Sequence, residues 1–313
     1  MASYLVTGGA GFIGSHIADT LIKQGGEVRI LDNFSTGKRE NIEPLQGHCQ
    51  VLEGDIRDPE VVDRAMRGVD YVIHQAALAS VPRSVHDPVS TNEVNVTGTV
   101  NLLHAARQHG IKKFVYASSS SVYGDTEILP KVEEMPTSPR SPYAVSKLAA
   151  ELYCQVFATV YDMSTVSLRY FNVFGPRQDP HSQYSAVIPL FIMALAERRS
   201  PTIFGDGEQS RDFTFVENVV SANILACHAD TVGAKVYNVA CGDRLTLNSL
   251  FSKLRAILKV ELEPVYGAPR PGDVKHSQAG IGAIENDLGY KVIVGTDNGL
   301  KRTVDWYVYN GGR

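Results

Sequence analysis

A tyrosine and a lysine four residues apart, Tyr143 and Lys147, follow a run of four serines at positions 118–121. Residues with this spacing on a helix share a face, so the phenol and the ammonium would point the same way. An ammonium near a phenol favours the phenolate, which lets the tyrosine act as a base near neutral pH. A serine of the run could share a substrate hydroxyl's proton with it. Such a group removes a proton from a carbinol and is useful only beside a hydride acceptor.

The N-terminus has the features that bind such an acceptor. Residues 4–7 are predicted as a buried strand, and Gly8, Gly11 and Gly14 follow with G-x-x-G-x-x-G spacing before a helical pattern. This turn lets backbone N–H groups approach a pyrophosphate, which the helix N-terminus also attracts. A second strand ends at Asp32, about 20 residues further on, where a ribose-binding acid belongs. Asp32 favours NAD over NADP, although Lys38 and Arg39 weaken that preference slightly.

Each feature alone has an ordinary explanation. A glycine-rich turn can join a strand to a helix without binding anything, and serines at a strand end can serve as turn or capping hydroxyls. A tyrosine and a lysine on one helix can be a surface pair. The three features together are much harder to explain in this way, so they favour an active site.

The order of predicted elements indicates an α/β fold with a doubly wound parallel sheet. Segments become shorter and richer in Pro and Gly after residue 172, so we expect an NAD-binding domain at 1–172 and a smaller substrate-binding domain at 173–313. The division is not strictly contiguous, because a helix at 215–229 and a strand at 235–240 could return to the sheet. Strands are predicted at 4–7, 27–31, 49–53, 70–74, 113–118 and 165–170, and helices at about 12–24, 59–67, 91–109 and 143–161.

Composition excludes several classes of protein. The 313 residues are 43% hydrophobic and 20% charged with a net charge of −4, which does not favour nucleic acid or an anionic membrane as a partner. The four cysteines (Cys49, Cys154, Cys227 and Cys241) have no metal-site or disulfide-scaffold spacing, and we expect no metal. No apolar run is long enough to span a bilayer. We expect a cytoplasmic protein.

Over essentially its whole length, the chain resembles the extended short-chain dehydrogenases/reductases. The resemblance rests on residues 7–14, Asp32-Asn33, residues 54–56, His74-Gln75-Ala76-Ala77, residues 119–124, Tyr143-x-x-x-Lys147 and residues 169–172. Within that superfamily it is most similar to the UDP-hexose 4-epimerases. Sugar-nucleotide dehydratases carry an Asp-Glu pair after the first active-site hydroxyl residue, and decarboxylases carry a Glu. Here Ser119 is followed by Ser120, Ser121 and Val122, so an epimerase is favoured.

The resemblance implies a role for each site residue. Tyr143 is the base, Lys147 tunes it and holds the nicotinamide ribose, and Ser119 bridges to the sugar 4-OH, with Ser118 and Ser120 as rivals. The cofactor is a tightly bound NAD. Its implied binding residues are Gly8, Gly11, Phe12, Ile13, Gly14, Asp32, Asn33, Ser35, Gly37, Asp55, Ile56, Gln75, Ala76, Ala77, Asn95, Tyr143, Lys147 and Tyr170. Those for the UDP-sugar are Arg83, Ser120, Ser121, Asn172, Val187, Phe204, Arg211, Arg270, Asp273 and Ser277.

One residue bears on which sugar is accepted. Family members restricted to UDP-glucose and UDP-galactose carry a bulky tyrosine four residues after the acid of the Gly-Asp pair, where this chain has Ser277. The resemblance therefore favours UDP-GlcNAc and UDP-GalNAc, with the plain pair left open. UDP-glucuronate is an alternative substrate, and Arg83 or His181 could bind its carboxylate. Further alternatives are a nucleotide-sugar 4-keto reductase and, outside enzymes, an NAD-sensing regulator.

The two long helical patterns at 91–109 and 143–161 would pack side by side on one sheet face. A second copy of the chain could add two more helices and close a four-helix bundle. We therefore expect a homodimer.

Overall fold

The computed structural model of the chain describes residues 1–180, 186–269 and 275–309. A sheet of seven strands lies at its centre, and each strand is parallel to its neighbours. This confirms the predicted doubly wound parallel fold. In spatial order the strands are β11 (Ala234–Val239), β6 (Thr165–Tyr170), β5 (Lys113–Ser119), β4 (Tyr71–His74), β1 (Ser3–Thr7), β2 (Glu27–Asp32) and β3 (Cys49–Glu53).

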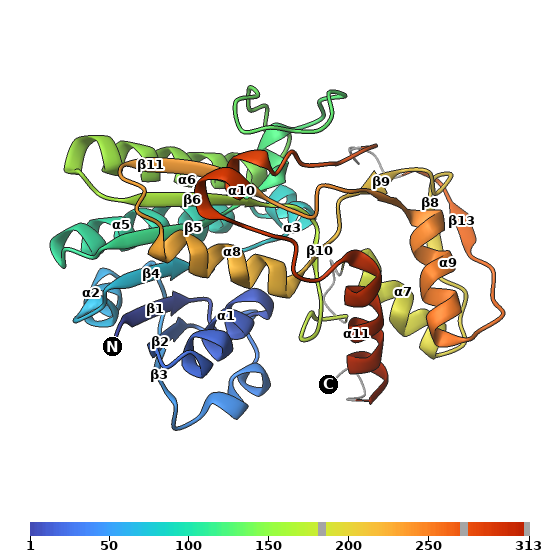
Figure 1. Ribbon diagram of the computed structural model, residues 1–313, viewed down its shortest axis with the longest axis horizontal. Coiled ribbons are helices and arrows are strands. Elements are labelled where there is room, and N and C mark those ends of the chain that lie inside the picture. Colours follow the sequence, from blue (N-terminus) through green and yellow to red (C-terminus); the bar gives the residue numbers. More distant parts are fainter. Residues whose placement is uncertain (181–185, 270–274, 310–313) are drawn as a thin grey trace.

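Helices cover both faces of this sheet (Figure 1). On β1, Leu5 and Val6 point to opposite faces, and each belongs to a separate apolar cluster. Burial on both faces explains why the strands read as continuous apolar runs rather than as alternating ones. Helices α1 (Phe12–Lys23) and α8 (Val216–His228) pack on one face, and α2 (Pro59–Met66), α5 (Gly98–Gln108) and α6 (Pro142–Tyr161) pack on the other.

The helix predicted at 91–109 is interrupted. A short helix α4 (Pro88–Asn92) runs into a π-helical turn, η3 (Glu93–Thr97), before α5 begins. The turn contains Asn95, whose side chain binds both the N–H and the C=O of Leu78, at 2.8 and 3.2 Å. Such π turns cluster at functional sites, and this one fixes the segment that follows β4.

Helix α6 is positioned by both its start and its buried face. Ser141 caps it by accepting a hydrogen bond from the Ala144 N–H at 3.2 Å, and Pro142 supplies a preset φ at the first position. Ala150, Cys154 and Phe157 bury the helix in the apolar cluster that also contains Phe114 of β5. The first turns of α6, with Tyr143 and Lys147, therefore lie beside the C-terminal end of β5.

Most of the remaining elements form a smaller part beside the sheet, where Figure 1 places α7, α9 and α11, whereas α3 packs against α6 and α10 against β11. Helix α8 and strand β11 come after this part begins in sequence yet pack with the main sheet, and the division near residue 172 stays our proposal. The elements outside the sheet are α3 (Val81–His86), β7 (Val173–Phe174), α7 (Val187–Ala196), β8 (Thr202–Phe204), β9 (Ser210–Arg211), β10 (Thr214–Phe215), β12 (Leu245–Thr246), α9 (Leu247–Leu258), β13 (Val265–Gly267), α10 (Gly282–Leu288) and α11 (Thr296–Tyr309).

Among the helices of residues 1–180, 186–269 and 275–309, none combines the length and the apolar character needed to cross a membrane.

Candidate active site

A cavity of about 260 Å³ lies at the carboxyl ends of the central strands. This is the edge at which open α/β sheets bind ligands. Most of the residues predicted to hold a dinucleotide line it, namely Gly8, Gly11, Phe12, Ile13, Gly14, Asp32, Asn33, Ser35, Gly37, Asp55, Ile56, Gln75, Ala76 and Ala77. Asn95, Tyr143, Lys147 and Tyr170 do not line it.

The glycine-rich turn is compact enough to exclude side chains. Gly8 has a φ of +67°, and a Cβ there would lie 2.6 Å from the backbone nitrogen of Ala76. A Cβ on Gly14 would lie 2.2 Å from the carbonyl oxygen of Gly8. At Gly8 and Gly14 the turn therefore presents backbone without side chains, which suits the close approach of a diphosphate.

Asp32 is held at the end of β2 with its carboxylate almost fully buried. Oδ2 accepts a hydrogen bond from the Ala10 N–H at 2.9 Å, and Oδ1 accepts one from the Phe34 N–H at 2.8 Å. Burial raises the pKa of this carboxyl, and the two backbone hydrogen bonds oppose that rise. A Cβ on Gly37 would come within 2.9 Å of both carboxylate oxygens, so no side chain covers them from that direction. This geometry suits a ribose diol.

Two charged groups near Asp32 are already engaged. Lys38, which we expected to soften the preference against NADP, pairs with Asp179 at 3.1 Å. Asp55 accepts hydrogen bonds from Arg57 and from Asn33, the latter at 2.9 Å. The bond from Arg57 is the main reason that the pKa of Asp55 falls to about 2. Asn33 and Asp55 thus hold each other where β2 and β3 end.

The three predicted catalytic residues come together beside the end of β5. The Ser119 side chain lies close enough to the Tyr143 hydroxyl to lower the pKa of the phenol against the rise that burial causes. Lys147 is buried, donates from Nζ to the Ala117 carbonyl oxygen at 2.8 Å, and lies 5.9 Å from the centroid of the Tyr143 ring. A phenol, a hydroxyl and an ammonium therefore converge from one helix and one strand end.

The charges of this group differ from the simple expectation. Burial raises the pKa of Tyr143, and the Ser119 side chain opposes the rise. Burial also lowers the pKa of Lys147 to about 7. Without bound ligands the lysine does not make the phenol acidic, because the cost of burying a phenolate exceeds the attraction of an ammonium that carries only part of a charge at neutral pH.

The structure separates the rival serines. Ser118 Oγ donates to Glu151 Oε2 at 2.7 Å, and Glu151 in turn pairs with Arg169 at 2.6 Å in a fully buried cluster. This engagement removes Ser118 from contact with a substrate. Ser119 Oγ accepts a hydrogen bond from the Ser121 N–H at 3.2 Å, and the same side chain lies close to the Tyr143 hydroxyl. Ser119 is the member of the run that meets the tyrosine.

Two predicted cofactor residues support the site from behind. Asn95 donates to Ser146 Oγ at 3.0 Å, and Ser146 donates to the Tyr143 carbonyl oxygen at 2.8 Å. The other hydrogen bonds of Asn95 hold the backbone of Leu78, which lines the smaller cavity. Tyr170 receives a hydrogen bond from Gln75 Nε2 at 2.9 Å, so it orients a residue that lines the cavity.

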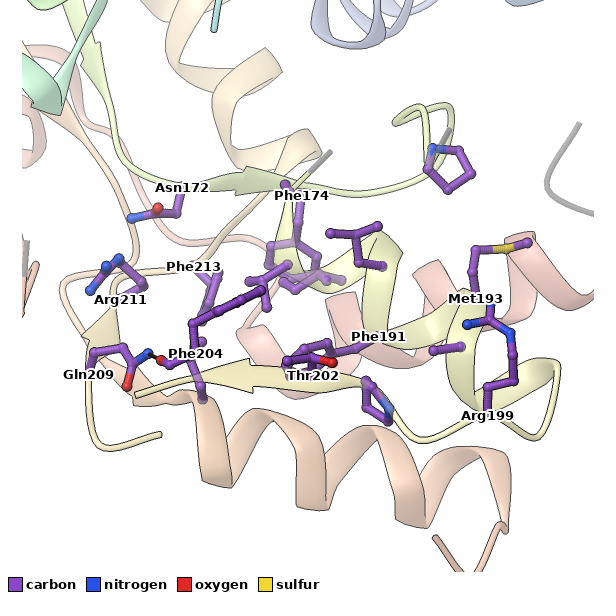
Figure 2. Close-up of a pocket in the computed structure, with 18 of the residues that line it drawn as sticks. Asn172, Phe174, Phe191, Met193, Arg199, Thr202, Phe204, Gln209, Arg211 and Phe213 are labelled. Carbon is purple, nitrogen blue, oxygen red and sulfur yellow. Dashed lines mark hydrogen bonds between the residues drawn. The ribbon is translucent and has the colours of Figure 1, made fainter. Parts of the chain in front are cut away.

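A larger cavity of about 520 Å³ lies in the smaller part of the molecule, beginning at the segment that follows β6. Asn172, Val187, Phe204 and Arg211, all predicted to bind the sugar nucleotide, line it. Figure 2 shows Asn172, Gln209 and Arg211 at one end of this space, Met193 and Arg199 at the other, and Phe174, Phe191 and Phe213 between them. A polar end and an apolar body suit an amphipathic ligand such as a nucleoside diphosphate.

The other predicted substrate residues lie elsewhere. Arg83 is exposed on α3, and Ser277 is buried with its N–H bound to the Ser210 carbonyl oxygen at 3.0 Å. Ser120 is half-buried, and Ser121 Oγ is buried with no hydrogen-bond partner within the described chain. None of these four lines the larger cavity. Arg270, Asp273 and His181 lie outside the described residues.

Sequence reasoning missed three residues that serve the site. Ser84 accepts a hydrogen bond from the Tyr143 N–H at 3.0 Å, and Asn223 of α8 binds both Tyr170 and Gln75. Arg177 lines the smaller cavity. No spacing motif connects these positions to the glycine-rich turn. The one available signal is the Gly-Pro pair before Arg177, which indicates a turn immediately before a charged side chain.

Comparison with known proteins agrees with this arrangement. A family model described as "NAD dependent epimerase/dehydratase family" matches residues 4–240. A putative UDP-glucose 4-epimerase of Methanocaldococcus jannaschii is 40% identical over 98% of both chains. A solved UDP-N-acetylglucosamine 4-epimerase of Methanobrevibacter ruminantium M1, in complex with UDP-N-acetylmuramic acid, superposes with a TM-score of 0.95 at 42% identity over 99% of both chains. A Thermus thermophilus UDP-glucose 4-epimerase in complex with NAD gives 0.89 at 39% identity, over 98% of this chain and 99% of that one.

Proposed function

The chain belongs to the NAD-dependent epimerase/dehydratase family, and on that premise we propose that it inverts C4 of UDP-GlcNAc and UDP-GalNAc and also accepts UDP-Glc and UDP-Gal. Within the family it is an NAD-dependent UDP-sugar 4-epimerase. The observation that carries the proposal is the placement of Tyr143, Ser119 and Lys147 together at the end of β5, with a dinucleotide cavity at the same sheet edge and no carboxylate among residues 119–122.

The residues of the site divide the work. NAD, when bound, accepts and returns the C4 hydrogen as hydride and brings a positive charge that favours the phenolate. Tyr143 takes the proton of the sugar 4-OH, and Ser119 holds that oxygen. Lys147 supplies positive charge beside the phenol and binds the hydroxyl groups of the nicotinamide ribose. Gly8, Gly14 and Asp32 hold the rest of the dinucleotide through backbone N–H groups and a carboxylate.

The larger cavity supports rotation of the sugar. Inversion requires the 4-keto sugar to present its other face to the cofactor while the nucleotide stays bound. Asn172 and Arg211 line one end of the cavity and suit contacts to the diphosphate, and Phe204 and Val187 line its apolar wall. Fixing the nucleotide through its diphosphate leaves the sugar free to turn.

The preference for acetylated sugars rests on the family resemblance at position 277, although Ser277 does not line the larger cavity, and on the similarity to an enzyme named for UDP-N-acetylglucosamine. A serine leaves room where a tyrosine would fill the space, and its hydroxyl offers a partner for the amide. The overall similarity to enzymes named for UDP-glucose is almost as high, so both sugar classes are included in the proposal.

A direct assay tests the reaction. Purified protein without added NAD is incubated with UDP-GlcNAc or UDP-Glc, and the C4 epimers are separated by chromatography. We expect both to be converted, because the cofactor is retained. Tyr143→Phe should lower kcat by about 10²–10⁴-fold with NAD still bound, whereas Tyr153→Phe, an exposed position on the same helix, should have no effect. Undiminished turnover by Tyr143→Phe would contradict the mechanism.

A second pair of variants tests the substrate preference. Ser277→Tyr should reduce kcat/KM for the acetylated sugars and spare UDP-Glc, whereas Ser277→Ala keeps the space and should reduce it only slightly. Equal loss for both sugar classes would remove Ser277 as the determinant and leave the epimerase intact.

We also propose a homodimer through α6. Val145, Leu152, Val156 and Val160 leave between 48% and 62% of their area exposed along this helix, an apolar row that a soluble surface rarely leaves uncovered. Analytical ultracentrifugation should give a dimer that Val156→Glu dissociates. A cytoplasmic location remains a prediction from the sequence.

A further inference from the structure

One short segment separates the two cavities. Asn172 and Pro180 line the larger cavity, whereas Arg177 and Asp179 between them line the smaller one. Residues 176–179, which we call the bridging segment, therefore cross from the substrate side of the molecule onto the cofactor side.

Four contacts fix the bridging segment. His16 of α1 binds the Pro176 carbonyl oxygen at 2.9 Å, and Asp179 pairs with Lys38 at 3.1 Å. Arg177 Nη2 meets Asp19 of α1 at 3.4 Å. Tyr307 of α11 donates to the Gln178 carbonyl oxygen. The segment is thus attached both to the helix that begins at the glycine-rich turn and to the smaller part of the molecule.

Arg177 has features of an unfilled anion-binding group. Its backbone is left-handed, with a φ of +66°, a conformation that costs energy for a residue with a side chain. The Nη1 atom of Arg177 is buried and has no hydrogen-bond partner within the described part of the chain. The other terminal nitrogen, Nη2, makes only a long contact with Asp19, at 3.4 Å. A buried guanidinium nitrogen without an acceptor costs free energy. The fold therefore keeps this side chain beside the cavity despite two costs, the left-handed backbone and the unpaired nitrogen.

We propose that Arg177 binds the diphosphate of the dinucleotide, and that the bridging segment, tied down by the pair Lys38–Asp179, retains the cofactor between the two half-reactions. A guanidinium offers paired donors that match phosphate oxygens. The backbone N–H groups of the glycine-rich turn would then meet the diphosphate from one side and Arg177 from the other. The inference rests on the proposed function only in placing NAD in the smaller cavity.

The chemistry of the ligand gives a direct test. Arg177→Gln removes the charge at similar length, and binding of NAD, ADP and adenosine is measured by calorimetry on protein freed of nucleotide. We expect the affinities for NAD and ADP to fall by about 10- to 100-fold. Affinity for adenosine, which lacks the diphosphate, should be unchanged. NAD should also be lost during gel filtration of the variant and kept by the wild-type protein.

Matched variants exclude a merely structural role. Arg198→Gln removes an exposed arginine that is also left-handed, with a φ of +56°, and should not change NAD binding. Asp19→Asn breaks the same ion pair from the other side and should keep or raise the affinity for NAD, because it frees the guanidinium. If Arg177→Gln does not fold, Arg177→Lys should give an intermediate loss for NAD and ADP.

The outcomes separate the two proposals. Equal NAD affinity in wild type and Arg177→Gln, or equal loss in Arg177→Gln and Asp19→Asn, overturns the role of Arg177 and leaves the epimerase proposal intact. A wild-type protein that binds neither NAD nor ADP would instead overturn the placement of the cofactor. Lys38→Gln should raise the dissociation rate of NAD by no more than about fivefold, since the pair is partly exposed.

Discussion

The two cavities of this protein are built from different parts of the polypeptide. The smaller one is built around glycines, strand ends and the start of α1, which come from separate stretches between residues 8 and 179. The larger one is lined mainly by side chains, among them Phe174, Phe191 and Phe213, and nearly all of its lining comes from residues 172–213. Backbone recognition depends on conformation and tolerates little change. Side-chain recognition can be altered one residue at a time without disturbing the fold.

The difference extends to the supporting interior. Behind the catalytic residues, the buried pair Glu151–Arg169 and the amide of Asn95 fix strand ends and the first turns of α6. Around the larger cavity the supporting contacts are apolar, and Phe204 and Leu190 remain 36% and 43% exposed. The cofactor side is therefore held by directional bonds, whereas the substrate side is held by packing.

The largest effect is expected from adding one carbon to the backbone-built cavity. Gly14→Ala places a Cβ 2.2 Å from the Gly8 carbonyl oxygen, so the turn must shift. We expect a loss of about 1–3 kcal/mol in NAD binding, which is roughly 5- to 150-fold in dissociation constant. Calorimetry on nucleotide-free protein measures it.

A matched glycine provides the control. Gly282 begins α10, and a Cβ there would meet nothing within 4 Å, so Gly282→Ala should leave NAD binding unchanged. If Gly14→Ala binds NAD as tightly as Gly282→Ala does, the turn is not the rigid element that the comparison requires.

A second variant tests the energetic cost of the buried lysine. The pKa of Lys147 is about 7 in the folded chain, well below the ordinary value of 10.5. Between these values the unfolded chain holds a proton that the folded chain has released, so stability rises with pH there, and the full burial cost applies below pH 7. Lys147→Met removes that cost. Without nucleotide its stability advantage over wild type should be larger at pH 6 than at pH 9, by about 2–3 kcal/mol.

The pH dependence is the informative measurement. Urea unfolding at pH 6, 7.5 and 9 should show the advantage of Lys147→Met shrinking as the pH rises, while epimerase activity is absent throughout. A difference between the two proteins that stays constant with pH would mean that Lys147 keeps its proton in the folded chain.

Sequence reasoning succeeded where chemistry depends on local spacing. Gly8, Gly11 and Gly14 lie in one turn, and Tyr143 and Lys147 lie on one helix, so the period of each element places them without knowledge of the whole fold. Asp32 could be predicted as the ribose-binding acid because the β–α–β unit has a nearly fixed length. The sheet followed from the alternation of strands and helices.

It failed where contacts join distant segments. Arg177 meets α1 across more than half of the chain, and neither its left-handed turn nor its buried nitrogen leaves a periodic signal. Ser118 could not be separated from Ser119 until Glu151 and Arg169 were seen to engage it. The raised pKa of Tyr143 in the chain without ligands left no signal in the sequence either, because spacing does not reveal burial.

The smallest effect is expected in the cavity built from side chains. Phe204 ends β8, lines the larger cavity and is 36% exposed, so its loss should disturb little besides the ligand. Phe204→Ala should raise KM for the UDP-sugar about fivefold, as expected for roughly 1 kcal/mol of apolar contact, with kcat unchanged. Tyr266→Ala, on the paired strand β13 and outside the cavity, is the control. A fall in kcat with KM unchanged would show that this wall acts on the reacting sugar, and the division between a rigid cofactor side and an adjustable substrate side would then fail.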